Sequence, residues 1–322
     1  NGDSEYHPPA YSEPLSNLEA KLKNGEFVVA TEVTPPLSAG PAKLIHDIEL
    51  VKPYVTVINF TDSSSANPKM SGLACCKAAN DLKAEAVYQI AARDTTRTGL
   101  QAAAIGACQF GIKNILCITG DSSKVGPSPT ADLNFVDIDS VQMLWILRRM
   151  RDQGIYLDGR KMKYPPKYFL GAATSPFASD PVLQAIRDQK KVNAGAQFFQ
   201  TNIVFEHGGI DLWLEELDKR NVLNKVYILI GVATLKNYKV ARYLNDHVPG
   251  VNVPERILRR MEIAGDKESE EGVQIALEFI DTIKNKKGVN GIHLMTMGWE
   301  AIVERIVKES GLAYPPAPLK GG

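Results

Sequence analysis

NILCITGD, residues 114–121, joins an apolar run to an abrupt polar end, and it indicates the fold of the chain. Residues 115–118 have no polar face, which is typical of a strand covered on both sides. Gly120 permits a turn or a close approach to a ligand, and Asp121 places a carboxylate where the strand ends. Ligands bind at such strand ends in parallel α/β folds. Taken alone, the segment fits equally well an ordinary strand-to-loop turn with Asp121 as a helix cap.

Seven further segments are mostly apolar and rich in Val, Ile and Phe, and helical patterns lie between them. The eight predicted strands are residues 27–33, 55–60, 86–92, 114–119, 168–174, 196–204, 226–233 and 291–297. Eight strands that alternate with helices predict an α/β fold of the (β/α)8 TIM-barrel type. A doubly wound open sheet is the alternative, but it seldom needs eight parallel strands. No GxGxxG follows the first strand, which disfavours a dinucleotide-binding fold.

The pattern divides the chain into a barrel and two flanking segments. We expect an N-terminal extension at 1–25, the barrel at 26–312 and a C-terminal tail at 313–322. Residues 254–286 predict two helices before the eighth strand, more than a minimal barrel needs. Residues 121–138 form a long polar loop after the fourth strand, and such loops are usually functional or disordered.

Composition limits the classes of partner. Lys+Arg and Asp+Glu number 37 each, so the formal net charge is zero. This balance argues against nucleic acid or an anionic membrane as the main partner, and it permits a homo-oligomer or a hetero-complex. No apolar run approaches the ~20 residues that span a bilayer, so no membrane insertion is expected. The polar, proline-bearing start has neither signal-peptide nor transit-peptide character, and we expect a cytoplasmic protein.

The cysteines and histidines do not form a reactive set in the sequence. Four cysteines contain no CxxC pair and no Cys/His cluster with metal spacing, so neither a bound metal nor an iron–sulfur cluster within this chain is expected. The absence of a Ser/His/Asp or Cys/His set argues against nucleophilic hydrolysis. His293 lies in the eighth predicted strand and is expected to be a satisfied core histidine.

Polar and small residues occupy the ends of the predicted strands. Glu32 ends an apolar strand, where burial should raise its pKa and suit it to be a general acid. The alternative is a glutamate paired with a lysine or arginine. The other candidates are Asn59, Thr61, Asp62, Gln89, Thr119, Gly120, Asp121, Ala172, Ala173, Thr174 and Asn202. Amides, hydroxyls and small residues suit a planar, hydrogen-bonding heterocycle such as a flavin or pterin.

Three cations end the helix that follows the fifth strand: Arg187, Lys190 and Lys191. A solvated helix end, favoured by the macrodipole, is the simpler interpretation. With a phosphorylated cofactor, the same residues would be natural anchors.

An ordered set of segments carries a family resemblance. The segments are TEVTPP (31–36), NFTD (59–62), ITGD (118–121), GAATSP (171–176), KKVNAGAQFFQTN (190–202), IGVATLKNY (230–238) and VPGVNVPERILRRM (248–261). Together they resemble the methylenetetrahydrofolate reductase family of flavin-dependent (β/α)8 enzymes. The N-terminal extension and the segments RDTTRTGLQ and FVDIDS are most similar to the branch found in anaerobic one-carbon metabolism.

The resemblance implies a noncovalent flavin, FAD or FMN, that gives a hydride to the methylene carbon of 5,10-methylenetetrahydrofolate, yielding 5-methyltetrahydrofolate. Glu32 matches the glutamate credited with the protonation that opens the folate ring to an iminium. Asp121 matches the aspartate that lies near the flavin and hydrogen-bonds the pterin. Flavin-contact segments match at Gln89, Thr119, Gly120, Ala173, Thr174 and Lys191.

Three positions depart from the family pattern. Asn202 replaces a glutamine that reads the pterin, Leu244 replaces a stacking phenylalanine, and Trp299 replaces an arginine. These changes argue against direct use of NAD(P)H, and the resembled branch implies an iron–sulfur electron-donor subunit. Two alternatives are a non-catalytic or electron-relaying flavin subunit, and a flavin-free folate or pterin methyltransferase barrel. The pair Glu32 and Asp121 favours a reductase over a relay, and the flavin-contact set disfavours the methyltransferase.

Overall fold

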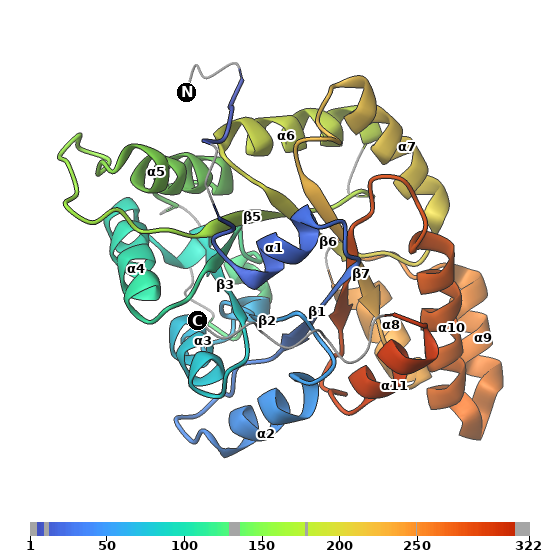
Figure 1. The fold of residues 1–322 in the computed structure, drawn as a ribbon. Coiled ribbons are helices and arrows are strands. Elements are labelled where there is room, and N and C mark those ends of the chain that lie inside the picture. The colour runs from blue at the N-terminus through green and yellow to red at the C-terminus, as the bar shows by residue number, and fades with distance from the viewer. Residues whose placement is uncertain (1–4, 10–12, 129–135, 178–179, 249, 313–322) are drawn as a thin grey trace.

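Eight parallel strands close into a barrel in sequence order (Figure 1). The structure, a computed structural model, describes residues 5–9, 13–128, 136–177, 180–248 and 250–312. The strands are β1 (Val28–Val33), β2 (Val57–Phe60), β3 (Ala86–Ala91), β4 (Asn114–Ile118), β5 (Phe169–Thr174), β6 (Phe198–Ile203), β7 (Tyr227–Ala233) and β8 (Gly291–Met295). Each observed strand lies inside its predicted segment, so the (β/α)8 prediction is confirmed.

A layer of helices surrounds the strands. Its members are α2 (Ala42–Val51), α3 (Gly72–Asp81), α4 (Arg97–Gln109), α5 (Ser140–Gln153), α6 (Pro181–Ala194), α7 (His207–Lys219), α8 (Tyr238–His247), α9 (Glu255–Ala264), α10 (Glu268–Ile283) and α11 (Ile302–Glu309). The two helices predicted before the last strand are α9 and α10. Helix α10 packs on β7, whereas α9 packs on α8 and α10 and lies farther out (Figure 1).

Local sequence signals set the ends of these helices. Asp139 accepts a hydrogen bond from the Gln142 backbone, and the Gln142 side chain accepts one from the Asp139 backbone, which completes a capping box at the start of α5. Helix α5 ends at Gln153 and is capped by Gly154, whose φ of 64° lies in the left-handed region. Asp180 caps α6 in front of Pro181, which is pre-organised for a first helical position.

The lower half of the barrel interior is apolar and is closed by α1 (Asn17–Lys23). Leu18 and Leu22 of α1 are 0% and 2% exposed. They pack with the inward residues Val28, Ala30, Val57, Val87, Leu116, Phe169, Phe198 and Leu229. Figure 1 shows α1 in front of the strands. The helix within the predicted 1–25 extension therefore contributes directly to the barrel core.

Glu85, just before β3, anchors α1 to the barrel. Its carboxylate accepts the backbone N–H groups of Asn17 and Leu18, each at 3.0 Å, and the Asn114 side-chain amide at 2.8 Å. The first N–H groups of a helix have no partner within the helix, so Glu85 supplies one for two of them. Burial raises the pKa of the Glu85 carboxyl group.

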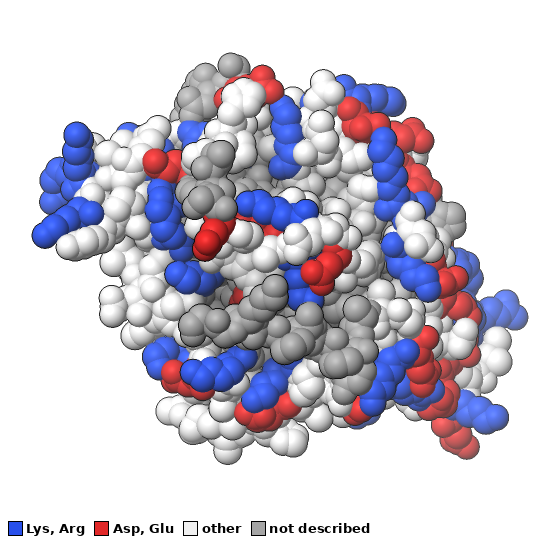
Figure 2. Space-filling model, viewed as in Figure 1, with Lys and Arg blue, Asp and Glu red and all other residues white. Residues whose placement is uncertain are grey.

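The outer surface carries both signs of charge. On the face shown in Figure 2, Lys and Arg are interspersed with Asp and Glu, as the equal counts imply. None of the described helices combines the length and apolar character needed to cross a bilayer. The predicted tail at 313–322 and residues 129–135 of the predicted long loop lie outside the described residues.

The Glu85 anchor predicts a stability effect that depends on pH. Because the folded-state pKa is raised above the ordinary value of 4.5, folding favours the protonated carboxyl group. That contribution is full below the unfolded pKa and is lost as pH rises through the folded pKa. The free energy of unfolding of the wild type minus that of Glu85→Gln should therefore fall over this pH range in urea titrations. A flat difference would contradict the prediction.

Two further variants complete this measurement. Glu85→Ala removes the acceptor of both α1 N–H groups and should cost about 2 kcal/mol or more at neutral pH. Glu255→Gln, at the exposed start of α9, removes a carboxylate without touching the anchor and should leave the wild-type stability nearly unchanged.

Candidate functional site

The barrel interior changes from apolar to polar toward the C-terminal ends of the strands. Alternate residues of a strand point to the same side. Successive inward side chains of each strand therefore lie progressively closer to the C-terminal end of the barrel. The upper inward side chains include Glu32, Asn59, Gln89, Gln200 and His293. Active sites of (β/α)8 barrels gather at these strand ends, so this mouth is the candidate site.

Asn59 and Gln200 form an amide pair across the barrel interior. Asn59 Nδ2 donates to Gln200 Oε1, and Gln200 Nε2 donates back to Asn59 Oδ1 at 3.3 Å. Both side chains are buried. The amide of Asn59, predicted as a cofactor contact, is therefore engaged within the barrel interior.

Glu32 reaches the mouth because β1 ends one residue later, at Val33. Its side chain is 24% exposed, and Oε2 lies 3.8 Å from Nε2 of His293. This exposure exceeds what the apolar strand alone predicts. Within the described part of the chain, no lysine or arginine lies at ion-pair distance from Glu32, so the alternative of a paired glutamate is not observed.

Asp121 is exposed at the exit of β4 and joins two neighbouring loops. Its Oδ2 accepts the backbone N–H of Ser65 at 2.7 Å. Its carbonyl oxygen accepts Nη1 of Arg93 at 3.0 Å, and Nη2 of Arg93 donates to the Ser63 carbonyl at 3.0 Å. Arg93, which the sequence did not single out as a site residue, thus ties the exits of β2, β3 and β4 together.

The backbone around Asp121 adopts sparsely populated conformations. Ser63, Ser65 and Ala66 have φ angles of 45°, 55° and 52°. Such angles are costly for non-glycine residues and concentrate at functional sites. Gly120 has φ +85°, and a Cβ atom there would lie 3.1 Å from the Cβ atoms of Ala91 and Arg93. A glycine at position 120 is thus favoured both by the positive φ and by the close packing around its Cα.

Lys69 brings a positive charge that interacts electrostatically with both predicted catalytic carboxylates. Its Nζ donates to Ser64 Oγ at 2.6 Å. Burial lowers the pKa of the Lys69 amine, while the charges of Glu32 and Asp121 oppose that shift. The sequence did not identify Lys69, because nothing in the residues around it indicates that Glu32 and Asp121 lie near it in the fold.

Three predicted cofactor residues lie directly after β2 or within β3. Asp62 Oδ2 accepts the Ala91 backbone N–H at 2.9 Å, and burial raises the pKa of its carboxyl group. Thr61 Oγ1 is buried and has no hydrogen-bond partner among the described residues. Gln89 is buried and inward-facing. The orphaned Thr61 hydroxyl is the clearest vacant hydrogen-bonding group in this part of the mouth.

The predicted cofactor residues of β5 face two different sides. Ala173 points inward, whereas Ala172 and Thr174 face the helix layer. Thr174 Oγ1 donates to buried Asp188 of α6, which also accepts Nε1 of Trp213 at 3.0 Å. At the mouth, Ala172 and Thr174 therefore offer main-chain groups rather than side chains.

The three cationic side chains of α6 lie in different surroundings. Lys191 Nζ donates to the Ala173 carbonyl at 2.7 Å and lies 3.7 Å from Asp188 Oδ1. Burial lowers the pKa of the Lys191 amine. Arg187 and Lys190 are exposed on the surface of the same helix. Only Lys191 of the three is brought directly to the end of β5.

Thr119, which follows β4, is also exposed, and its hydroxyl oxygen lies 3.5 Å from Ser140 Oγ.

Asn202 lies at an irregularity of β6. The pairing register with β7 shifts between Gln200 and Ile203, as in a β-bulge. Asn202 Oδ1 accepts the Ile203 backbone N–H at 2.8 Å, and Thr201 Oγ1 accepts the Gly231 N–H at 2.8 Å. Bulges re-aim side chains and are frequent next to active sites.

The other two departures from the family pattern lie in different surroundings. Leu244 of α8 is fully buried in a second apolar cluster with Ala233 of β7 and Met261 of α9. Trp299, after β8, is half-buried and packs against the main core. The β6–β8 side of the mouth is thus backed by apolar packing, whereas the β1–β4 side carries the charged groups.

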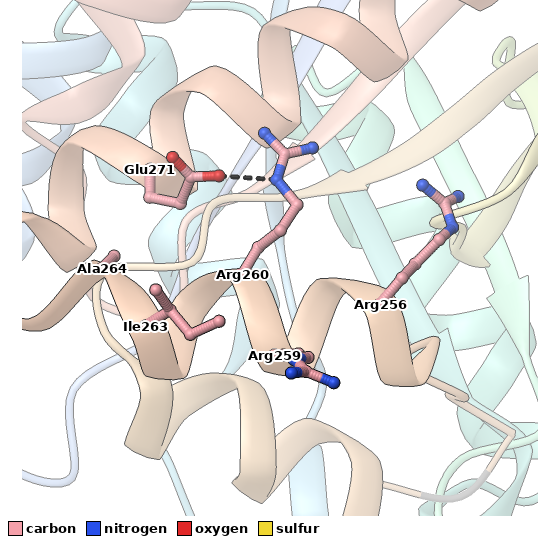
Figure 3. A pocket seen from close by; sticks show the side chains of 6 residues that line it. All are labelled: Arg256, Arg259, Arg260, Ile263, Ala264 and Glu271. Atoms are coloured by element: carbon pink, nitrogen blue, oxygen red, sulfur yellow. Dashed lines mark hydrogen bonds and ion pairs between the residues drawn. The ribbon is translucent and has the colours of Figure 1, made fainter.

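A surface pocket lies elsewhere, between α9 and α10. Figure 3 shows Arg256, Arg259, Arg260, Ile263, Ala264 and Glu271 lining it. Arg260 donates to Glu271 at 2.6 Å and to Glu278 at 2.7 Å, and Arg256 donates to Glu206 at 3.2 Å. Ion pairs between exposed side chains explain this surface without a ligand.

The described residues do not form a metal-binding cluster. Within them, no three His, Cys, Asp or Glu side chains are grouped so as to bind a metal ion. All four cysteines are free thiols, and burial raises the pKa of the Cys75, Cys76, Cys108 and Cys117 thiols.

Comparison with known proteins gives one family match. The sequence model of a family described as methylenetetrahydrofolate reductase matches residues 17–311. Among curated proteins, no sequence matches the chain.

Three solved structures are similar to the chain to different degrees. An uncharacterized protein from Clostridium thermocellum that binds two copies of 5-methyl-5,6,7,8-tetrahydrofolic acid has a TM-score of 0.64 and 13% identity, and the match covers 92% of this chain and 98% of that one. A 2,3-dimethylmalate lyase has 9% identity and a TM-score of 0.49, covering 94% and 85%. Tryptophan synthase from M. tuberculosis has 12% identity and a TM-score of 0.48, covering 92% and 96%. The first likeness supports the barrel fold.

The Gly120 geometry predicts a stability difference between two glycines. Gly120→Ala should lower the free energy of unfolding by about 1–3 kcal/mol, because it adds a steric clash to an unfavourable φ. Gly159 has a similar φ of +89° but no atom near its missing Cβ. Gly159→Ala should therefore cost only the conformational term, about 1 kcal/mol. Equal losses in urea unfolding would show that packing at Gly120 contributes nothing.

Proposed function

Because the chain belongs to the methylenetetrahydrofolate reductase family, we propose that it reduces 5,10-methylenetetrahydrofolate to 5-methyltetrahydrofolate with a noncovalent flavin. The observation that supports this most is the arrangement of charge at the mouth. A half-buried carboxylate on β1 and an exposed carboxylate after β4 act on the same amine, that of Lys69.

Glu32 is proposed to be the general acid. It protonates one of the two folate nitrogens that are bonded to the methylene carbon. The bond between that nitrogen and the carbon then breaks, and the carbon forms an iminium with the other nitrogen. Its position at the strand end lets it touch substrate, and its partial burial keeps most bulk water away from the transferred proton.

Asp121 is proposed to stabilise the cationic iminium and to hydrogen-bond the pterin. A fixed negative charge aimed at developing positive charge lowers the barrier without reorganisation. The Ser65 N–H and the Arg93 guanidinium hold the Asp121 backbone and carboxylate in place. Asn202 is proposed as a second substrate contact, since the bulge places it at the end of β6.

The proposal of a flavin, FAD or FMN, is supported by a vacant hydroxyl group and a small residue at the mouth. Thr61 Oγ1 is buried without a partner among the described residues, and inward-facing Ala173 carries only a methyl group. A bound reduced flavin would supply the hydride for the methylene carbon. The residues proposed to hold it are Asn59, Thr61, Asp62, Gln89, Thr119, Gly120, Asp121, Ala172, Ala173, Thr174, Arg187, Lys190 and Lys191.

Within this set the residues differ in what they offer. Lys191 offers an ammonium beside the Ala173 carbonyl, while Ala172 and Thr174 offer main-chain groups only. Arg187 and Lys190, exposed on α6, are proposed as anchors for the phosphate of the cofactor.

The proposed setting is a cytoplasmic redox assembly. The departures at Asn202, Leu244 and Trp299 disfavour direct hydride transfer from NAD(P)H, so an iron–sulfur subunit is proposed as electron donor. A homo-oligomer or hetero-complex is compatible with the zero net charge. Folate binding by the C. thermocellum protein of similar fold is compatible with a folate at this barrel.

Replacing the proposed acid tests the mechanism. Glu32→Gln should retain the flavin absorbance of the wild type but reduce methylenetetrahydrofolate roughly 10²–10⁴-fold more slowly, because the amide has no proton to give. Glu49→Gln, on the exposed surface of α2, is the matched control and should keep the wild-type rate. A near-normal rate for Glu32→Gln would remove Glu32 from this role. Wild-type protein that shows no flavin absorbance after reconstitution would rule out a flavin enzyme.

The electron donor is tested separately. Under anaerobic conditions, reduced viologen should reduce the bound flavin much faster than NADH in stopped-flow mixing. Viologen transfers single electrons without a docked nicotinamide, so it does not need the contacts that the chain has replaced. Fast reduction by NADH would contradict the proposed dependence on a partner protein.

A further inference from the structure

His293 is a buried histidine on the strand next to Glu32. In the strand register, β8 places it between Ala30 of β1 and Gly231 of β7, and its side chain is 2% exposed. The sequence predicts a satisfied core histidine. The structure places His293 in the core, but one of its two ring nitrogens has no hydrogen-bond partner among the described residues.

The two nitrogens of the imidazole have different surroundings. Nε2 lies 3.8 Å from Glu32 Oε2, whereas Nδ1 is buried and has no hydrogen-bond partner among the described residues. A separation of 3.8 Å is longer than a hydrogen bond, but catalytic hydrogen bonds are often long without substrate and tighten in the complex. A buried unpaired polar group costs about 1–3 kcal/mol, which an apolar side chain of similar volume would avoid.

Glu32 is the charged group that faces His293 from the neighbouring strands. On β7, the inward residues Leu229, Gly231 and Ala233 do not titrate. Across the interior, Asn59 pairs with Gln200, and both amides are neutral.

Other charged groups interact with Glu32 or lie beyond β8. Lys69 interacts electrostatically with Glu32 and with Asp121. Beyond β8, buried Glu300 interacts with Lys43 of α2. Among the described residues, Glu32 is therefore the one charged group at ion-pair distance from His293.

We propose that His293 is a positioning residue for Glu32, in which Nε2–H donates to Oε2 and directs the other carboxyl oxygen, with its proton, at the substrate. This inference rests on the proposed function of Glu32 as general acid. A neutral imidazole with its hydrogen on Nε2 leaves Nδ1 as an unprotonated acceptor. That assignment agrees with the geometry, because the nitrogen without a partner is then not a buried N–H group.

Three substitutions separate positioning from packing. His293→Gln keeps a side-chain N–H group near the place of Nε2, His293→Leu fills the volume without a donor, and His293→Ala removes both. Initial rates of methylenetetrahydrofolate reduction are measured anaerobically with reduced viologen, with flavin content and circular dichroism recorded for each variant. Leu and Ala should lower kcat by up to about 10²-fold with little change in KM for the folate, and Gln should restore most of the loss.

The pH profile and a double-variant cycle give readouts that packing alone would not move. A donor to a carboxylate favours its ionised form, so losing it should shift the alkaline fall of kcat/KM to higher pH in His293→Leu. In a Glu32→Gln background, His293→Leu should add no further loss. Leu229→Ala, an inward and fully buried position of β7, should lower stability and leave the pH profile unchanged.

The outcomes distinguish this inference from the proposed function. Wild-type protein that holds flavin but never reduces the folate overturns the proposed function and the inference with it. An active wild type with unchanged kcat and pH profile in His293→Leu overturns the inference alone. The inference also fails if His293→Gln is as impaired as His293→Leu, if only KM changes, or if the losses of the double variant add.

Discussion

The pairing of β8 with β1 closes the sheet, and this closure constrains every inward side chain of the barrel. A closed sheet has no edge, so alternate residues of eight strands must share one interior. Apolar residues and the two leucines of α1 fill the lower part of that interior. Higher up, the interior contains polar groups, and burying them requires hydrogen-bond partners. The Asn59–Gln200 pair meets this requirement by joining strands on opposite sides of the barrel.

Hydrogen bonds between loops hold Asp121 at the mouth, whereas Glu32 is positioned by β1. Arg93 contacts the backbone of Ser63 and of Asp121, and Asp121 contacts the backbone of Ser65. This network holds residues of the β2 loop at positive φ, a conformation that persists only when the surrounding structure determines it. The proposed chemistry benefits from such rigidity, because charges that are already oriented stabilise a developing cation without reorganisation.

The mouth is also asymmetric. The exits of β1–β4 carry Glu32, Asp121 and Lys69, whereas the β6–β8 side is backed by the apolar cluster that contains Ala233 and Leu244. A flat ligand with one polar edge and one apolar face suits such a mouth, and this supports both a flavin and a pterin. Leu244 lies fully buried in that cluster, so its side chain contributes to the support of the mouth rather than to an exposed stacking surface.

The sequence by itself determined the eight strands, the order of the elements, and the placement of Glu32 and Asp121 at strand ends. Local features suffice for these, because an apolar run, its flanking glycine and the residue that follows are neighbours in the chain. The sequence did not determine which side of β5 Ala172 and Thr174 face, since a shift of one residue reverses every side chain of a strand. It also did not reveal the roles of Arg93 and Lys69, the α1 closure of the barrel, or the approach of His293 to Glu32. Those contacts join residues that are brought together only when β8 meets β1 and the loops pack over the closed barrel, so tertiary structure alone decided them.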